Sequence, residues 1–444
     1  MNLMLVSSPV NFNKLSSLLL NLIFFILFYR IVFAKHSLEV LPIFIILVIT
    51  FLWIIKIKNN NNLKMSYPRS SIYLIFISSI FIISIEFFLH TPPNQDVINQ
   101  ITNKQIFKMY NLNYAYSLAF ITLPFIIQNI KYNPHYLFTI ISLFNFLYIT
   151  FNLYLMFFLK YERNELVTHI YSIINYDNTT IILILLTYLY SFYLKSIKKD
   201  YMSLILFFTS LLSIFINISH GTRGTWVAIL FIIFLNFWFY KKDIKYYIKL
   251  ALPVSLITIP FIYIKKEQLL ERTYMIYYDF SSFFNGTQVT SIGSRFEMWL
   301  LAMENFKTSP FFGVGSLEVA HELCSMSVQG IIAGECLTHM HNIYFQELST
   351  HGLAGFLSLL LIFIIPLFYF LNFIKKNKSE LEFFLSLAGI YTILIVMICG
   401  LSDFYFISGI AASLYYIIIL TLLSLLYNQQ LNIGDKPNLM SKNR

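Results

Sequence analysis

Charged side chains are scarce in this chain. Asp, Glu, Lys and Arg make up only 12% of its 444 residues, whereas 58% are hydrophobic. A soluble domain with so little charge and so much apolar surface would not stay dispersed in water. The sequence therefore predicts an integral membrane protein that has the lipid bilayer as its solvent. Its 46 Phe and 31 Tyr residues are typical of helices packed in hydrocarbon with rings at the headgroup level.

Acidic residues are fewer than basic ones, 21 against 31, which gives a formal net charge of +10. The basic residues do not gather on one soluble face, so the charge does not indicate nucleic acid as a partner. They instead follow alternate apolar runs, which is the positive-inside pattern and predicts that both termini are cytoplasmic. The groups are Lys56, Lys58, Lys64 and Arg69; Lys195, Lys198 and Lys199; Lys241, Lys242, Lys245 and Lys249; Lys375, Lys376 and Lys378; and Lys436, Lys442 and Arg444.

Cysteine is also rare, with three residues. Cys399 lies inside an apolar run, which indicates a buried free thiol. Cys324 and Cys336 lie in a long loop, and their spacing permits either a disulfide or two free thiols if that loop faces an oxidising compartment. A cleavable signal peptide is not apparent either, because the first apolar run simply opens a series of them, so we expect the N-terminus to be retained.

Apolar runs long enough to cross a bilayer, roughly 20 residues each, recur along the chain. They predict an all-α integral membrane protein of about 12 transmembrane helices. We expect helices 1 to 9 within 1–264, a large outer loop over 265–351, helices 10 to 12 within 352–427, and a polar cytoplasmic tail over 428–444. The predicted spans lie near 15–33, 38–55, 71–89, 113–130, 136–159, 180–195, 201–218, 224–240, 247–264, 352–374, 383–400 and 408–427.

The outer loop over 265–351 far exceeds the usual length of a connection, so it is either functional or disordered. Its sequence favours order. Ser294 and Glu297 have the spacing of a capping box, which predicts a helix that begins at Ser294 and ends near Phe306. Pro310, Gly313 and Gly315 then predict a turn.

Two arginines are candidates for binding an anion. Arg223 stands in a polar turn that opens an apolar helix, where free N–H groups, the helix dipole and a guanidinium all favour a phosphate group. An interfacial arginine that anchors the helix to lipid headgroups is the alternative. Arg295 lies in the first turn of the predicted loop helix, an unfavourable place for a cation. A bound phosphate or an ion pair with Glu297, Glu304 or Glu318 would compensate it.

A His-x-His pair and two acidic residues are the remaining candidates. Neutral imidazole is well suited to accept a proton from a sugar hydroxyl, which makes His339 and His341 candidates for a general base. Residues two apart on a helix face different sides, and no clear carboxylate completes a zinc site, so we expect no metal. Asp403 lies at the outer end of an apolar run, where it would orient an imidazole or pair with an arginine. Glu86 lies within another run and is a functional candidate by its depth.

Four stretches together resemble the O-antigen ligase family, within the wider O-antigen ligase and polymerase superfamily. His341 and Asn342 carry the most specific part, because nine residues separate Asn342 from Gly352 and two more precede Gly355, as in the ligase pattern. Outside the second half of the chain the likeness is one of hydropathy and topology. The four stretches are Thr222-Arg223-Gly224-Thr225, Ser291-Ile292-Gly293-Ser294-Arg295 with Trp299, His341-Asn342 with Gly352 and Gly355, and Gly400-Leu401-Ser402-Asp403.

The resemblance implies a GT-C-like membrane glycosyltransferase of the bacterial inner membrane, with a periplasmic active site and no cofactor. Such an enzyme transfers a polysaccharide from undecaprenyl diphosphate to the lipid A core oligosaccharide in lipopolysaccharide biosynthesis, without a nucleotide and with inversion. The family roles map onto His341 as the catalytic residue and onto Arg223 and Arg295 for the donor diphosphate. His339, Asn342 and Asp403 would support them.

Other functions remain open at this point. An O-antigen polymerase would use the same lipid-linked donor, and a protein-directed oligosaccharyltransferase is a further relative. A transporter of lipid-linked sugar would place ionisable residues and broken helices near the bilayer midplane, often in two related halves. Here the charged candidates gather at the outer surface and no halves repeat, which favours an enzyme.

Overall fold

The computed structural model describes 9–33, 50, 54, 72–90, 112–130, 132–160, 172–241, 246–249, short pieces between 263 and 285, 290–334, 336–376 and 379–434. Over these residues every regular element is helical, so the predicted all-α class is confirmed. Seven described helices are long and apolar enough to cross a membrane. They are α1 (Pro9–Phe33), α8 (Pro134–Leu153), α10 (Ile173–Ser196), α11 (Asp200–Ser219), α16 (Ile343–Lys376), α17 (Glu380–Cys399) and α18 (Gly409–Gly434).

Two shorter apolar helices, α3 (Tyr73–Leu89) and α12 (Arg223–Phe239), occupy two further predicted spans. The predicted spans near 38–55 and 247–264 fall almost entirely outside the described residues. The total of 12 therefore stays a prediction.

One predicted span is interrupted. The run near 113–130 forms a short 3₁₀ helix (Leu112–Ala115), then α6 (Tyr116–Ala119), and after a turn α7 (Leu123–Ile130). Pro124 explains part of this, because proline cannot donate a backbone N–H within a helix but fits its first turn. Hydropathy alone cannot detect such a break, since every residue around it is apolar enough for the bilayer.

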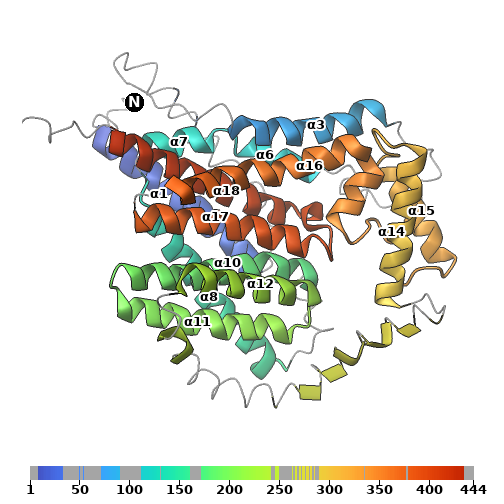
Figure 1. The fold of residues 1–444 in the computed structure, drawn as a ribbon, viewed down its shortest axis with the longest axis horizontal. Coiled ribbons are helices and arrows are strands. Elements are labelled where there is room, and N and C mark those ends of the chain that lie inside the picture. Colours follow the sequence, from blue (N-terminus) through green and yellow to red (C-terminus); the bar gives the residue numbers. More distant parts are fainter. Residues whose placement is uncertain are drawn as a thin grey trace, which may run out of the picture.

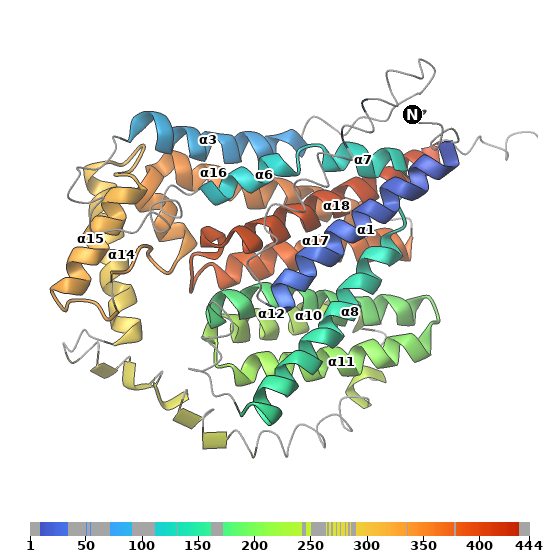
Figure 2. The ribbon, with the colours of Figure 1, turned by 180° about the vertical axis from the view of Figure 1, so that it is seen from behind.

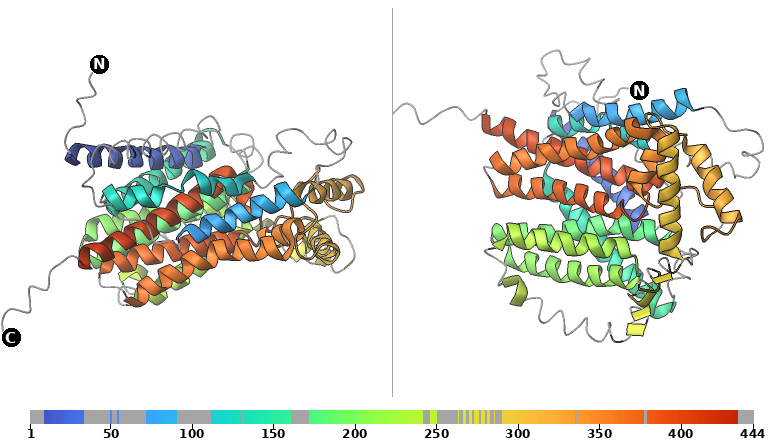
Figure 3. Two further views of the ribbon diagram at one scale, coloured as in Figure 1. Left: turned by 90° about the horizontal axis from the view of Figure 1, so that it is seen from above. Right: turned by 45° about the vertical axis from the view of Figure 1, so that its right-hand side comes forward.

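The apolar helices lie side by side in one bundle, with α3, α16, α17 and α18 in one part and α8, α10, α11 and α12 in another (Figures 1 and 2). Helices α14 (Ser291–Thr308) and α15 (Ser316–Val328) lie across one end of this bundle. The first residues of α1 and the last of α18 lie at the opposite end, as the views from above and from the side agree (Figure 3). The predicted outer loop thus contributes a separate layer over one end of the bundle.

The outer layer has an apolar core of its own. Met298 and Ala302 of α14 pack there against Val319 and Leu323 of α15, together with Met340. Cys324 and Cys336 are joined by a disulfide, which links α15 to the segment that leads to the histidines. The layer is therefore ordered.

Helix α16 is broken at Gly352, whose φ of 62° and ψ of −155° are not helical. A break leaves backbone groups without intrahelical partners, and the turn after α14 supplies them. Val314 and Gly315 donate their N–H groups to the carbonyls of Ser349 and Thr350, both at 3.0 Å. On the other side of the break, Leu353 and Ala354 donate to the carbonyls of Pro310 and Phe311, at 2.8 and 3.0 Å. The predicted turn at Pro310 to Gly315 is confirmed, and it fixes the outer layer to α16.

Two predicted boundaries were wrong. Helix α10 begins at Ile173 rather than near residue 180, because most of the polar residues that suggested a loop are buried inside the bundle, where Asp177, Thr179 and Thr180 make hydrogen bonds. Helix α18 continues to Gly434, beyond the predicted start of a disordered tail at 428. In both cases polar composition was taken as a sign of irregular structure.

Candidate active site at the outer end of the bundle

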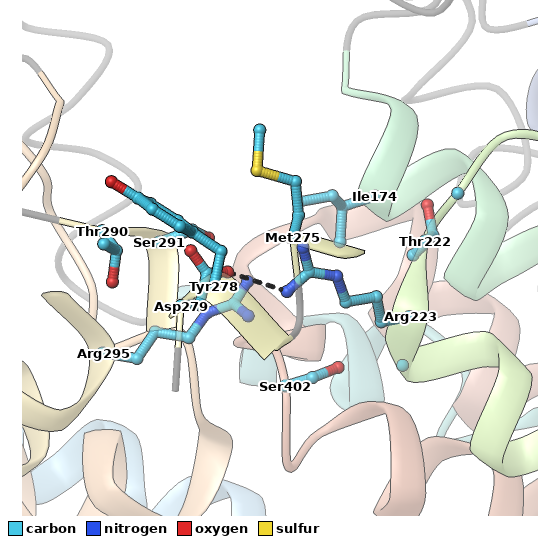
Figure 4. Close-up of a pocket in the computed structure, with 12 residues that line it drawn as sticks. Ile174, Thr222, Arg223, Met275, Tyr278, Asp279, Thr290, Ser291, Arg295 and Ser402 are labelled. Carbon is cyan, nitrogen blue, oxygen red and sulfur yellow. Dashed lines mark hydrogen bonds and ion pairs between the residues drawn. The ribbon is translucent and has the colours of Figure 1, made fainter. Parts of the chain in front are cut away.

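A cavity of about 380 Å³ lies between the bundle and the outer layer, and both predicted arginines line it (Figure 4). Arg223 is the first residue of α12, and Arg295 comes from α14. Their guanidinium groups point toward each other, with the carboxylate of Asp279 between them. Asp279 Oδ2 accepts a hydrogen bond from Arg223 Nη1 at 3.1 Å. Two residues far apart in the sequence thus form one cationic site.

Arg295 lies in a poorly hydrated place. Burial lowers the pKa of its guanidinium, and the nearby Arg223 acts in the same direction, whereas Asp403 and Asp279 oppose them. The charged groups that act on Arg295 are therefore not Glu297, Glu304 or Glu318, the partners considered from the sequence. A buried guanidinium next to a second one is stabilised by an anion.

The predicted start of the loop helix was wrong. Helix α14 begins at Ser291, and its N-cap is Thr290, whose hydroxyl accepts a hydrogen bond from Gly293 N at 3.0 Å. Ser294 Oγ accepts instead from Ala333 N at 2.8 Å, so it holds the returning chain against α14. Arg295 accordingly lies one turn further into the helix than predicted.

The motif at the end of α17 joins the arginine site to the histidines. Ser402 lines the cavity and packs against Gly224, where an added β-carbon would lie 2.0 Å from Ser402 Oγ. The next residue, Asp403, is buried and lies at the histidines. Two consecutive residues therefore touch the two parts of the candidate site.

Asp403 binds both histidines through one oxygen. Its Oδ1 lies 3.2 Å from His341 Nδ1 and 3.5 Å from His339 Nε2, and it also accepts a hydrogen bond from Phe404 N at 2.9 Å. Burial would raise the pKa of Asp403, but the hydrogen bonds and positive charge of the two histidines outweigh it and hold that pKa well below its usual range. Asp403 is thus an ionised group that orients His341.

The two histidines do not face different sides, as helical spacing had predicted. Their segment precedes α16 and is not helical, and His341 has a φ of 47°, an uncommon backbone conformation for a residue other than glycine. His339, His341 and Asp403 offer ligand atoms that all lie within 4.8 Å of one another, so these three form a candidate cation site. The statement that no carboxylate completes such a set was therefore wrong; the expected absence of a metal stays a prediction.

Asn342 and the paired glycines shape the backbone around His341. Asn342 Oδ1 accepts hydrogen bonds from Tyr344 N and Phe345 N at 2.9 and 3.2 Å, which caps α16, and its Nδ2 donates to Leu401 O at 3.0 Å. Gly352 forms the break in α16. Gly355 leaves room for His351, since a β-carbon there would lie 2.2 Å from His351 Cβ.

The match to a known family covers this part of the chain. Residues 208–360 match the family model described as O-antigen ligase. The predicted resemblance to the O-antigen ligases is confirmed. The match includes Arg223, Arg295 and His341, whereas Asp403 lies beyond it. Together with the seven apolar helices of the described residues, it points to a multi-pass membrane protein and supports a place in the O-antigen ligase and polymerase superfamily.

A relative in Haemophilus influenzae (strain ATCC 51907 / DSM 11121 / KW20 / Rd), named an uncharacterized protein, is 29% identical to this chain over 195 residues. The alignment covers 41% of this chain and 48% of the relative. The chain thus spans about half the length of this relative, whose name states no activity.

Sequence reasoning missed two acidic residues that touch the candidate site or its supporting residues. Asp279 gave no local signal, because it follows a run of aromatic residues in the loop. Asp177 lies in the polar stretch taken for a loop, yet it is buried in α10 and bonds Thr222, the neighbour of Arg223. A polar residue within a potential span was the only available signal for Asp177.

Glu86 also has a defined place, outside the cavity. Its Oε2 lies 3.1 Å from His90 Nδ1 and 3.1 Å from His351 Nε2, and its Oε1 accepts from Ser316 N at 3.2 Å. His351 Nδ1 lies 2.7 Å from Glu347 Oε2. This buried ion cluster connects α3, α15 and α16, so Glu86 holds the outer layer on the bundle.

Proposed function

We propose that this protein is an O-antigen ligase of the bacterial inner membrane. It transfers a polysaccharide from undecaprenyl diphosphate to the lipid A core oligosaccharide on the periplasmic face. The observation that supports this best is the connection through Ser402 and Asp403, which places a site with two arginines beside an imidazole oriented by a carboxylate.

The arginine site has the properties that a lipid diphosphate requires. Arg223 and Arg295 supply planar donors that bind phosphate oxygens in pairs, and the start of α12 adds backbone N–H groups. Asp279 now neutralises Arg223, so the diphosphate has to displace or share that carboxylate. The guanidiniums would stabilise the charge that develops on the leaving diphosphate.

His341 is positioned to act as the general base. When Nδ1 carries its proton and donates to Asp403, Nε2 is the nitrogen that accepts. The acceptor hydroxyl oxygen attacks the anomeric carbon of the donor sugar, its proton moves to Nε2, and the bond from that carbon to the diphosphate oxygen breaks. Undecaprenyl diphosphate leaves from the opposite face, so the anomeric carbon is inverted. Asp403 stabilises the imidazolium that forms.

The proposed mechanism needs no metal and no nucleotide, because a lipid diphosphate is already an activated leaving group. Orientation, charge neutralisation and a base account for the chemistry. His339 would bind the same oxygen of Asp403 as His341 does, rather than accept the proton.

The decisive experiment is transfer by purified protein from undecaprenyl-diphosphate polysaccharide to lipid A core, with EDTA and without nucleotide. We expect the wild type to form the product and His341→Ala to lose activity by a factor on the order of 10² to 10⁴, because the general base is gone. His339→Ala, a matched loss of one imidazole, should retain more activity than His341→Ala.

Three outcomes would change the assignment. Full activity in His341→Ala would remove His341 from the chemistry, and an inactive His339→Ala beside an active His341→Ala would reverse the two roles. Inhibition by EDTA that zinc reverses would make the His339, His341 and Asp403 cluster a metal site. Elongation of the carrier-linked glycan without transfer to core would indicate a polymerase, and movement of labelled lipid-linked glycan across vesicles without bond formation a transporter.

A further inference from the structure

Asp177 binds both polar residues of the turn that leads into α12. This aspartate lies on α10 and is fully buried. Its Oδ1 is 2.7 Å from His220 Nδ1, and its Oδ2 accepts a hydrogen bond from Thr222 Oγ1 at 2.5 Å. Gly221, between those two residues, has a φ of 76°. One carboxylate from a third helix therefore fixes the connection between α11 and α12.

The bond to Asp177 keeps the Thr222 hydroxyl from capping α12. Thr222 is the N-cap residue of α12, and an N-cap threonine ordinarily accepts a hydrogen bond from a backbone N–H of the first turn. Thr222 makes no such bond to α12, since its hydroxyl is directed at Asp177. The first N–H groups of a helix generally lack an intrahelical acceptor. In α12, Thr225 N donates to Thr222 O at 3.2 Å, which leaves the N–H groups of Arg223 and Gly224 for an acceptor other than the cap.

The start of α12 is also a wall of the cavity. Gly221, Thr222, Arg223 and Gly224 line it, opposite Arg295. An anion placed against Arg223 would therefore meet the backbone N–H groups that Thr222 does not cap. The capping hydroxyl and the anion compete for the same donors, and the position of the hydroxyl decides which one binds them.

We propose that Asp177 is a positioning residue for the anion site. Asp177 holds the Thr222 hydroxyl away from α12, so that the first-turn N–H groups remain available to the diphosphate. It also sets the direction in which the Arg223 side chain extends from the helix. The identity of the anion as the donor diphosphate rests on the proposed function; the anion site itself does not. Asp177 touches no substrate and acts only through Thr222 and His220.

The test measures binding of inorganic pyrophosphate to the purified full-length protein in detergent, followed by donor KM and kcat in the transfer assay. Asp177→Asn keeps the shape of the side chain but leaves one acceptor oxygen where His220 Nδ1 and Thr222 Oγ1 had two, which weakens the hold on the Thr222 hydroxyl. Thr222→Val removes the hydroxyl, whereas Thr222→Ser keeps it. Thr180→Val is the matched control, because Thr180 is a buried hydroxyl of α10 that donates to Tyr176 O in its own helix.

We expect Asp177→Asn to weaken pyrophosphate binding and to raise donor KM, on the order of tenfold, with kcat unchanged, because the released Thr222 hydroxyl can cap the first turn of α12. Thr222→Val leaves no hydroxyl to compete with the anion, so it should bind as the wild type does, and so should Thr222→Ser and Thr180→Val. The double variant of Asp177→Asn and Thr222→Val should bind more tightly than Asp177→Asn, since the competing hydroxyl is gone.

Equal pyrophosphate affinity in Asp177→Asn and Thr180→Val would overturn the proposal, and so would a double variant as weak as Asp177→Asn. Weaker binding by Thr222→Val than by Thr180→Val would also overturn it, even if Asp177→Asn does not fold, because a missing hydroxyl cannot occupy the N–H groups. Absence of pyrophosphate binding to the wild type would overturn it as well. A wild type that binds pyrophosphate but transfers no glycan would contradict the proposed function and leave the role of Asp177 to be judged by the binding data alone.

Discussion

Gly224 packs so closely against Ser402 that a β-carbon at position 224 would lie 2.0 Å from Ser402 Oγ and 3.2 Å from Ser402 Cβ. The contact brings the helix that carries Arg223 against the loop that carries Asp403. Neither chain segment could approach the other with a larger residue at position 224. The arginine site and the oriented histidine are therefore held together by a glycine.

The first prediction concerns this contact. Gly224→Ala should raise donor KM several-fold, because Ser402 must rotate or α12 must move away from the loop. Removal of the clashing hydroxyl in the double variant with Ser402→Ala should recover much of the loss, since the remaining contact of 3.2 Å needs only a small adjustment. Ser402→Ala alone is the control. A double variant as poor as Gly224→Ala would show that the hydroxyl is not what limits the contact.

The second prediction concerns Asp403. Asp403→Asn should lower kcat by a factor on the order of 10² to 10⁴, because a neutral amide cannot stabilise the imidazolium of His341. The pKa of Asp403 is depressed in the folded protein, so its contribution to stability is present above the unfolded value of about 3.9 and is lost as pH falls through the folded value. The difference in melting temperature between wild type and variant should thus shrink as pH falls below about 4. A difference that disappears near neutral pH would contradict the depressed pKa.

The third prediction concerns the break in α16. Gly352→Ala should lower the free energy of unfolding by more than about 2 kcal/mol, because a β-carbon there would lie 2.6 Å from Phe311 C in a backbone conformation reserved for glycine. Gly330→Ala is the matched control, since Gly330 also has a positive φ but has nothing within 4 Å of the added carbon. Gly330→Ala should lower the free energy of unfolding by about 1 kcal/mol, which is the cost of a positive φ at a residue with a β-carbon. Thermal unfolding in detergent measures both, and equal losses would mean that the docked turn moves aside easily.

The fourth prediction concerns Asp279. Asp279→Asn should strengthen pyrophosphate binding up to about fivefold, because the carboxylate competes with the anion for Arg223 and such a partly exposed pair contributes about 1 kcal/mol at most. Asp200→Asn makes the same change of charge in the exposed pair with Lys195 and should have no effect. Weaker binding in Asp279→Asn would instead show that Asp279 holds Arg223 in its binding position.

Local sequence patterns predicted the residues of the candidate site better than the caps and buried partners that hold those residues in place. Arg223 and Arg295 stood at helix starts, and His341 preceded an apolar run, so each was recognisable from its neighbours. The structure brings the arginines together and places Asp403 on His341. The helix cap was misplaced at Ser294 because Ser294 and Glu297 have the capping-box spacing, whereas the actual cap, Thr290, has Gly293 at that position and gives no such signal.

Contacts between distant segments were not predictable in this way. Asp177 lies in a polar stretch that has the composition of a loop, and only the packing of three helices shows that its partners lie at the start of α12. A metal site at His339 and His341 was set aside by assuming helical geometry, which the left-handed conformation of His341 replaces. Side chains that pair across the bundle leave no periodic trace in the sequence.

The break in α16 behaves as a rigid joint rather than a hinge. Bends in membrane helices often retain freedom because some backbone groups near them exchange partners. Here the groups on both sides of Gly352 are bonded to one turn of the outer layer, and the ion cluster around Glu86 adds a second attachment. His341 is therefore held at a fixed height above the bundle.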